Sequence, residues 1–333
     1  MQSQSLSATA DKRVQFIVRS TEDPLALDGP NVISGLCGSP KKISPIYVYD
    51  KRGTELFERQ CATPEYYLRR IEAQLLNCYA VDIVGLCGPL AVVELGAGTA
   101  AKTRILLREY AKREVRCDYL PIDVDVDTLA ESAHELISAF PLLYVHCLGT
   151  TYERGLRLVP SWSQPRLFVF LGSSLGNMEW PEVDSLLSRI FDNSAPGDYL
   201  LLGADLDKDS AIIDEAYNDA AGYGPQSTLN MLNHLNRRYG GNFESEQFRY
   251  RSQYDARARR NEVRIESLVD QTVTLATLGF TVSFGAGELI DAEVMLKFDP
   301  DELGAVLERA GFSMVRRWIE SVYRYGLFLL RRK

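Results

Sequence analysis

The stretch Ala91-Val-Val-Glu-Leu-Gly-Ala-Gly-Thr-Ala-Ala-Lys-Thr-Arg104 decides the fold of this chain. It predicts a buried strand over residues 91–95, a turn that carries Gly96 and Gly98, and a helix that begins near Lys102. Glycines at such a turn permit tight strand-to-helix geometry and let the backbone approach a ligand closely. The segment therefore indicates an α/β unit that binds a ligand at the turn.

The glycine spacing leaves the class of ligand open. Gly96, Gly98 and Ala101 also fit the dinucleotide-binding pattern, whose third position is Gly or Ala. Glu94 shifts the balance, because a carboxylate beside the turn repels a pyrophosphate but suits a positively charged ligand. S-adenosylmethionine is such a ligand, since it carries a sulfonium and an ammonium and no phosphate. We therefore favour a methyl donor, ahead of a dinucleotide and of an ordinary turn without a ligand.

An acidic residue ends the next expected strand. Tyr119-Leu-Pro-Ile-Asp123 is a short apolar run, and an acid at this position accepts hydrogen bonds from a ribose diol. Both candidate ligands contain ribose, so Asp123 supports nucleoside binding without choosing between them. The competing interpretation is a helix N-cap, a role that Asp125 or Asp127 fills better.

Strands and helices alternate from about residue 70 to residue 206. The expected helices and strands, in chain order, cover residues 70–86, 91–95, 102–112, 118–122, 126–139, 143–148, 166–171, 180–192 and 198–204. This alternation predicts an α/β fold with a doubly wound, Rossmann-like parallel sheet and a ligand at the carboxyl ends of its strands.

The alternation breaks over residues 207–296, which contain two helical stretches followed by β-like runs. After this region, a helix over residues 299–310 and a strand over residues 323–330 are again expected. We therefore expect an inserted α+β domain, with the N-terminal segment packed on it. The expected bounds are 71–206 plus 297–333 for the nucleoside-binding domain, 18–70 plus 207–296 for the insert, and 1–17 for a flexible segment.

Composition excludes several partner classes. The 333 residues are 46% hydrophobic and 25% charged, which is typical of a globular protein. The net charge of −8 argues against nucleic acid, and no apolar stretch reaches the ~20 residues of a membrane span. The six cysteines form no C-x-x-C pair and the three histidines have no partner at metal spacing. We expect a cytoplasmic monomer with no membrane partner and no metal site.

Two polar clusters are candidates for substrate chemistry. The run Phe168–Asn177 reads as a strand followed by a small-residue loop, and Asn177 could orient an amine through its side-chain carbonyl. A turn asparagine that bonds its own backbone is the alternative. Tyr49 and the pair Tyr66-Tyr67 could bind a carboxylate or a developing ammonium, although paired tyrosines usually pack in a core.

At these residues the chain resembles the histidine Nα-methyltransferase family of ergothioneine biosynthesis, which forms hercynine, a trimethylated histidine betaine. The resemblance runs from about Ser44 to the C-terminus. Its carriers are Tyr49-Asp50, Leu56-Phe57, Pro64-Glu-Tyr-Tyr67, Val93-Glu-Leu-Gly-Ala-Gly-Thr99, Lys102-Thr-Arg104, Phe170-Leu-Gly-Ser-Ser-Leu-Gly-Asn177, Leu201-Leu-Gly-Ala-Asp-Leu206, Ala216-Tyr-Asn-Asp-Ala-Ala-Gly222, Ala286-Gly-Glu288 and Glu293-Val-Met-Leu-Lys-Phe298.

The resemblance implies a SAM-dependent α-N-methyltransferase that acts on a free L-amino acid, by successive methylations. The cofactor residues that it implies, which span the amino-acid part, ribose and adenine of the donor, are Glu94, Gly96, Gly98, Lys102, Asp123, Thr151, Tyr152 and Ser174. The implied catalytic residues are Asn177, which holds the substrate amine, Tyr49, which lies near the methylated nitrogen, and Tyr66. The implied substrate-binding residues are Tyr66, Asn177, Tyr217, Val263, Glu293 and Met295.

The chain departs from the family pattern at the side-chain end of this pocket. Ser227-Thr228 replaces a Phe-Asn pair, Val263 replaces a methionine, and Met295 replaces a serine that helps to hold the imidazole. A lost hydroxyl weakens the binding of a polar ring. The pocket therefore indicates a paralogue for tyrosine or tryptophan, with histidine still possible through Glu293. The alternatives are an NAD-dependent oxidoreductase and a non-catalytic binding protein.

Overall fold

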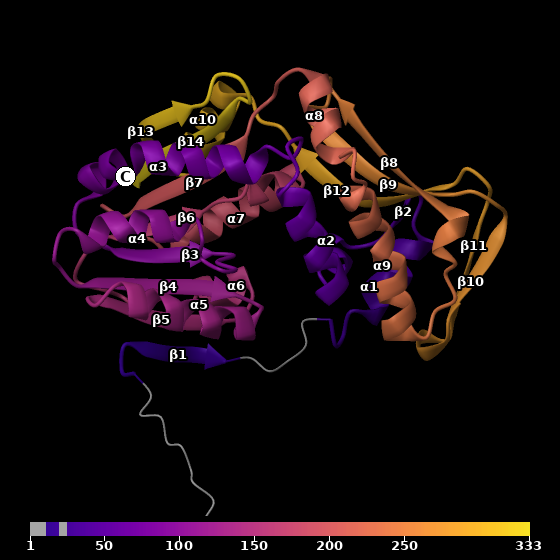
Figure 1. Cartoon of the computed structure of the whole chain (residues 1–333), viewed down its shortest axis with the longest axis horizontal. Helices are drawn as coiled ribbons and strands as arrows, with labels where there is room; N and C mark the ends of the chain where they lie inside the picture. The colour runs from indigo at the N-terminus through magenta and orange to yellow at the C-terminus, as the bar shows by residue number, and fades with distance from the viewer. Residues whose placement is uncertain (1–10, 20–24) are drawn as a thin grey trace, which may run out of the picture.

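The computed structural model describes residues 11–19 and 25–333. An eight-stranded sheet (the large sheet) occupies one half of the molecule, and a four-stranded sheet (the small sheet) with a two-stranded hairpin occupies the other half (Figure 1). The chain passes between the two halves four times: residues 14–19 and 68–205 belong to the large-sheet half, residues 29–61 and 210–296 to the small-sheet half, and the last three elements return to the large sheet.

The large sheet is parallel except for one strand. In spatial order its strands are β1 (Val14–Arg19), β5 (Leu143–Gly149), β4 (Cys117–Asp123), β3 (Ala91–Leu95), β6 (Arg166–Phe170), β7 (Tyr199–Asp205), β14 (Tyr325–Arg332) and β13 (Phe312–Ile319). Strand β14 runs antiparallel to both of its neighbours. Every residue of β3 is buried, as expected for a central strand with both faces covered.

Helices cover both faces of the large sheet. Side chains of β3 alternate between two hydrophobic clusters, with Val92 in one and Val93 and Leu95 in the other. The helices on the Val92 side are α3 (Leu68–Cys87), α4 (Thr103–Ala111) and α5 (Val126–Ala139), and those on the opposite side are α6 (Tyr152–Leu156), α7 (Trp180–Asp192) and α10 (Pro300–Arg309). The doubly wound α/β fold expected from the sequence is confirmed.

The topology places a binding crevice at β3. Successive strands run outward from β3 through β4 and β5 on one side, and through β6 and β7 on the other. The strand order thus reverses at β3, and ligands of open α/β sheets bind beyond the carboxyl ends of the strands at such a point. The turn after Leu95 lies at this position.

The small sheet is built from segments that are far apart in the sequence. Its strands, in spatial order, are β2 (Lys41–Lys42), β12 (Leu289–Leu296), β9 (Arg260–Ser267) and β8 (Phe248–Asp255). The accompanying elements are α1 (Gly29–Cys37), α2 (Lys51–Cys61), α8 (Ser210–Tyr217), α9 (Tyr223–Tyr239) and the hairpin of β10 (Gln271–Leu275) and β11 (Phe280–Phe284). Alternate residues of β9 are buried, which gives this sheet one inner face.

The N-terminal segment differs from the expectation. Residues 14–19 form β1, which pairs in parallel with β5 and extends the large sheet instead of packing on the insert (Figure 1). Val14 and Phe16 pack against the hydrophobic core, and this burial of apolar side chains stabilises β1 in the sheet. The expectation of a flexible segment over residues 1–17 is wrong for residues 14–17, which belong to this strand, and residues 1–10 lie outside the described residues. The assignment of the two halves to donor and substrate binding stays a prediction.

Two further observations concern the described part of the chain. None of its helices combines the length and the apolar character that a membrane crossing requires. All six cysteines are free, and three of them, Cys87, Cys117 and Cys147, are buried.

Candidate active site

The glycine turn, Asp123 and Tyr152 meet at the carboxyl ends of β3 and β4. Gly96 and Gly98 have backbone φ angles of +72° and +48°, which residues other than glycine rarely adopt. The Gly98 N–H donates to the Asp123 carboxylate at 2.8 Å. A Cβ on Gly96 would lie 2.8 Å from the Tyr152 hydroxyl, so this ring lies directly over the turn. Thr151 is the exposed N-cap residue of α6 beside it.

Asp123 keeps capacity for a ligand. Its other oxygen accepts the Asp125 N–H at 3.0 Å, and each carboxylate oxygen can accept a second hydrogen bond. Helix α5 does not use Asp123 as its cap, because Asp125 accepts the Thr128 N–H at 3.0 Å. Asp123 is partly exposed. The glycine turn and Asp123 therefore fit the amino-acid part and ribose of S-adenosylmethionine.

Glu94, near the end of β3, is buried and hydrogen-bonded within the protein. It is 3% exposed, and its two oxygens accept hydrogen bonds from the Thr103 hydroxyl at 2.6 Å and from the Tyr119 hydroxyl. Burial raises the pKa of this carboxyl to about 7. Glu94 thus ties the start of α4 to β4, and its direct contact with the cofactor stays a prediction.

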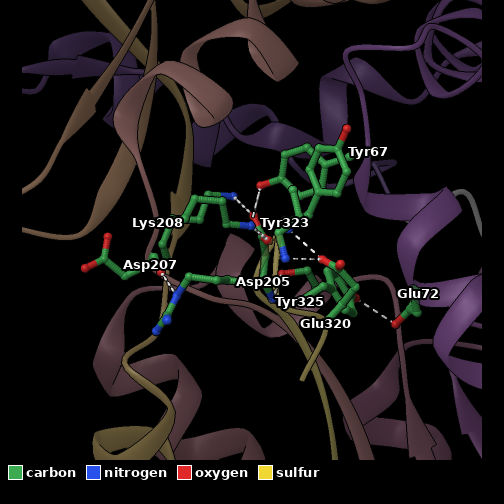
Figure 2. A network of polar contacts seen from close by, with 12 residues as sticks. Tyr67, Glu72, Asp205, Asp207, Lys208, Glu320, Tyr323 and Tyr325 are labelled. Atoms are coloured by element: carbon green, nitrogen blue, oxygen red, sulfur yellow. Dashed lines mark hydrogen bonds and ion pairs between the residues drawn. The ribbon is translucent and has the colours of Figure 1, made fainter. Parts of the chain in front are cut away.

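A second buried glutamate, Glu72 of α3, joins several elements around the crevice. It accepts the Gly172 N–H at 2.8 Å and the Lys102 ammonium at 2.8 Å. It also accepts the Tyr325 hydroxyl at 2.7 Å (Figure 2). Gly172 has a φ of +87°, and a Cβ there would lie 2.9 Å from the Lys102 ammonium. This cluster fixes the start of the loop that follows β6.

The same loop ends at Asn177, beside the small sheet. A Cβ on Gly176 would meet the Leu296 carbonyl oxygen at 2.8 Å, so glycine is required for the loop to pack on β12. Asn177 is exposed, and within the described residues its side-chain amide makes no hydrogen bond. The alternative of a turn asparagine that bonds its own backbone therefore has no support. Ser174 donates to the Leu171 carbonyl oxygen at 3.0 Å.

Between the two sheets lies a cavity of about 220 Å³. Small-molecule pockets typically measure ~300–1,000 Å³, so this volume favours a ligand the size of a single amino acid. The site residues expected from the sequence that line it are Tyr49, Tyr66, Lys102, Ser174, Asn177, Tyr217, Val263, Glu293 and Met295. The remaining expected residues, Glu94, Gly96, Gly98, Asp123, Thr151 and Tyr152, do not line this cavity.

One wall of the cavity is a row of aromatic rings. Tyr49, Phe57, Tyr66 and Tyr217 pack edge to face in that order, with ring centroids 6.2, 6.0 and 6.1 Å apart. Burial raises the pKa of the Tyr66 hydroxyl well above its ordinary value, so the phenol stays protonated. Protonated phenols can donate hydrogen bonds, and ring faces attract cations. The wall can therefore contact both ends of an amino acid.

Strands β9 and β12 contribute lining residues that depart from the family pattern. Val263 of β9 and Glu293 of β12 are direct cross-strand partners, and Met295 follows on β12. The Thr228 hydroxyl donates to Glu293 at 3.4 Å. Burial raises the pKa of the Glu293 carboxyl to about 7. This part of the cavity thus combines apolar side chains with one carboxyl that can either accept or donate a hydrogen bond.

Sequence reasoning missed a group of buried charges behind the cavity. Lys297 lines the cavity and donates to the Tyr217 hydroxyl at 2.9 Å and to Asp205 at 2.8 Å. Asp205 also accepts a hydrogen bond from Lys208. Asp205 could have been noticed, since it ends the apolar strand β7 as Asp123 ends β4. Its lysine partners carry no comparable signal.

Comparison with known proteins gives a consistent result. The family described as "Histidine-specific methyltransferase, SAM-dependent" matches residues 28–332. The chain is 34% identical over 299 residues to the histidine N-alpha-methyltransferases of Mycolicibacterium smegmatis and Mycobacterium tuberculosis, covering 90% of this chain and 93% of each relative. It is 27% identical over 188 residues to a 4-dimethylallyltryptophan N-methyltransferase of Claviceps purpurea, covering 55% and 53%.

These matches favour neither the oxidoreductase nor the non-catalytic alternative. The family match spans the small sheet and all of the large sheet except β1, and it includes the glycine turn and the cavity. The chain therefore belongs to the family of S-adenosylmethionine-dependent histidine-specific methyltransferases.

Proposed function

We propose that this S-adenosylmethionine-dependent amino-acid N-methyltransferase acts on a free aromatic L-amino acid and methylates its α-amine successively, with tyrosine or tryptophan preferred over histidine. One observation carries the proposal. The cavity keeps the tyrosines and the asparagine expected at the amino-acid end, whereas Val263 and Met295 make its side-chain end less polar.

The donor side is supported by the geometry of the turn. S-adenosylmethionine supplies an electrophilic methyl group on its sulfonium when bound. Gly96 and Gly98 give it backbone access, and Asp123 offers a carboxylate for the ribose hydroxyls. Lys102 and Ser174 border both the loop after β6 and the cavity, so they would lie between the donor and the substrate.

The amino-acid end would align the nucleophile. The side-chain carbonyl of Asn177 is free to accept an N–H of the substrate amine, which favours the unprotonated amine as the attacking group. The hydroxyls of Tyr66 and Tyr217 would donate to the carboxylate. Holding the amine and the methyl group in line contributes several kcal/mol, on the order of 7 or more in well-oriented cases.

Repeated methylation needs a surface that tolerates a growing positive charge. Each transfer breaks the S–CH₃ bond, leaves S-adenosylhomocysteine and gives a methylated ammonium, which releases a proton to solvent before the next transfer. The final product is quaternary and cannot donate a hydrogen bond. The aromatic rings of Tyr49, Phe57 and Tyr66 form such a surface along the cavity. Tyr49 is 51% exposed, so its ring is available to a ligand.

The side-chain end would set the specificity. Val263 is smaller than the methionine that it replaces, which leaves room for a larger ring, and Met295 cannot replace the hydrogen bond of a serine hydroxyl. Glu293 remains able to accept an indole or imidazole N–H or a phenol O–H. The Claviceps purpurea relative, named for a tryptophan derivative, supports this direction.

A panel of free L-amino acids tests the proposal. The purified enzyme is incubated with S-adenosylmethionine and each amino acid, and mass spectrometry resolves products with one, two or three added methyl groups. We expect tyrosine or tryptophan to give the highest kcat/KM. A panel in which no aromatic amino acid is methylated contradicts the proposal.

A further inference from the structure

Asp205 lies at the centre of a buried polar network behind the cavity (Figure 2). It ends β7, is fully buried and accepts hydrogen bonds from three side chains. These come from the Tyr67 hydroxyl at 2.7 Å, the Lys297 ammonium at 2.8 Å and the Lys208 ammonium. Lys208 also donates to the Tyr67 hydroxyl at 2.7 Å.

The charges of this network do not cancel. Two ammonium groups, each with only 1% of its side chain exposed, share the single carboxylate of Asp205. Burying a charge is costly unless it is paired, so a second buried lysine needs a further anionic partner to offset its desolvation. Lys208 does not line the cavity, whereas Lys297 does. Lys297 is therefore the ammonium of this network that a ligand in the cavity can meet.

The contact between Lys297 and Tyr217 has a fixed direction. An ammonium has three donors and no acceptor, so the Tyr217 hydroxyl must accept from Lys297 at 2.9 Å. The hydroxyl proton of Tyr217 is then free to be donated to another group. Within the described residues this hydroxyl has no second partner, and Tyr217 lines the cavity.

We propose that Lys297 is a positioning residue for substrate recognition: it holds the Tyr217 hydroxyl as a hydrogen-bond donor to the α-carboxylate of the substrate. The proposal rests on the proposed function, since it assumes a free amino acid in the cavity. Asp205 holds the ammonium in place from behind.

The arrangement makes the site selective for a free carboxylate. A carboxylate accepts the Tyr217 proton with a charged oxygen, which makes this hydrogen bond strong. A carboxamide offers only one neutral oxygen as an acceptor, and its N–H₂ group can only donate. An amino-acid carboxamide keeps the amine and the side chain of the parent amino acid. A comparison of the amino acid with its carboxamide, made for each variant against the wild type, therefore isolates the recognition of the carboxylate.

The experiment compares kcat/KM for the best amino acid with that for its carboxamide. The variants are Lys297→Met and Tyr217→Phe, singly and together. Lys208→Met is the matched control, because it also removes a buried ammonium from Asp205 but leaves the cavity wall unchanged. Circular dichroism and S-adenosylhomocysteine binding establish that each variant is folded, and Tyr217→Phe keeps the test decisive should Lys297→Met not fold.

We expect the acid-to-amide ratio of the wild type to fall about ten- to a hundred-fold in Lys297→Met, mainly through KM of the acid, as for a lost charge-assisted hydrogen bond. Tyr217→Phe should lower the ratio similarly, the double variant should fall little further, and Lys208→Met should keep the wild-type ratio. An unchanged ratio in Lys297→Met, or equal losses for acid and amide, overturns the inference.

Additive losses in the double variant would show that Lys297 binds the carboxylate directly, which also overturns the positioning role. Failure of the proposed function gives a different result. In that case the wild type methylates no amino acid in the panel, and there is no ratio to lower.

Discussion

The Glu72 carboxylate accepts the Gly172 N–H at 2.8 Å, although 100 residues separate the two along the chain. This contact joins helix α3 to the loop that carries Asn177, and the same carboxylate binds the Lys102 ammonium. The geometry of both the donor side and the amine side of the site therefore depends on the position of one buried side chain.

Gly203→Ala tests that dependence. A Cβ on Gly203 would lie 2.0 Å from Glu72 Oε1, so the carboxylate must move and its contacts with Gly172 and Lys102 must change. We expect a loss of about 1–3 kcal/mol in the free energy of unfolding, as for overpacked cores, together with reduced turnover. Denaturant unfolding measures the change. Gly85→Ala is the control, because a Cβ at this helical position meets no atom within 4 Å; equal stability of both variants would contradict the prediction.

The donor site is tested by S-adenosylhomocysteine. The ligand should bind the wild type and raise its melting temperature, because it stabilises only the folded state. Asp123→Ala should weaken this binding, since the ribose diol loses its acceptor, by about 1–3 kcal/mol. Asp127→Ala removes an exposed carboxylate nearby and should leave the affinity unchanged. Equal affinities in the two variants, measured by calorimetry, would remove Asp123 from the donor site.

Asn177 is tested by separating binding from turnover. We expect Asn177→Ala to keep S-adenosylhomocysteine affinity and to lower kcat by about a hundred-fold or more, because the amine is no longer aligned with the methyl group. Calorimetry and a single-turnover assay give the two quantities. Asn77→Ala, which removes an exposed helical asparagine, is the control. Normal turnover of Asn177→Ala would mean that the amine is held elsewhere.

The side-chain end is tested by restoring the family residues. Histidine should be a mediocre substrate of the wild type, and Val263→Met with Met295→Ser should raise its kcat/KM by about ten- to a hundred-fold relative to tyrosine and tryptophan, because one buried hydrogen bond is regained. The Thr228→Ser variant, which keeps a hydroxyl beside Glu293, serves as the control. A wild type that already prefers histidine, and a double variant that prefers it less, would show that these substitutions do not set specificity.

The buried carboxyl of Glu94 should make the free energy of unfolding depend on pH. Burial raises its pKa in the folded protein to about 7 from an ordinary value of 4.5, so between these values the folded state binds more protons than the unfolded state. The protonated carboxyl therefore contributes its full stabilisation of the folded state below pH 4.5. This contribution to the free energy of unfolding is lost as pH rises toward 7, and its upper limit is about 3 kcal/mol. Glu94→Gln should remove this part of the pH dependence. A stability difference between wild type and variant that is constant with pH would contradict the assignment.

Much of the large sheet could be predicted from the sequence because its signals are local. Apolar strands bounded by glycines and amphipathic helices alternate at short intervals, and the expected strand over 143–148 differs from β5 by only one residue. The insert was harder to predict. Strand β12, with Glu293 and Met295, carries mixed polar and apolar residues because one end of it lines a cavity. Strand β1 joins a sheet whose other strands lie far along the chain.

The residues of the cavity wall could be found in the sequence, but the charges that support them could not. Glu72 lies within an ordinary amphipathic helix, and its partner Tyr325 is 253 residues away. Lys297 lies directly after β12 and gives no sign that it is buried. Contacts of this kind depend on tertiary packing, which a single sequence does not encode in any local pattern.

The cross-strand pairing of Val263 with Glu293 has a consequence for protein engineering. The two positions and Met295 are neighbours on the small sheet, whereas Gly96, Gly98 and Asp123 belong to the large sheet. A combinatorial library confined to positions 263, 293 and 295 would therefore vary the accepted ring while the methyl-donor machinery stays constant. Such a library would use this scaffold as a source of N-methyltransferases for different amino acids.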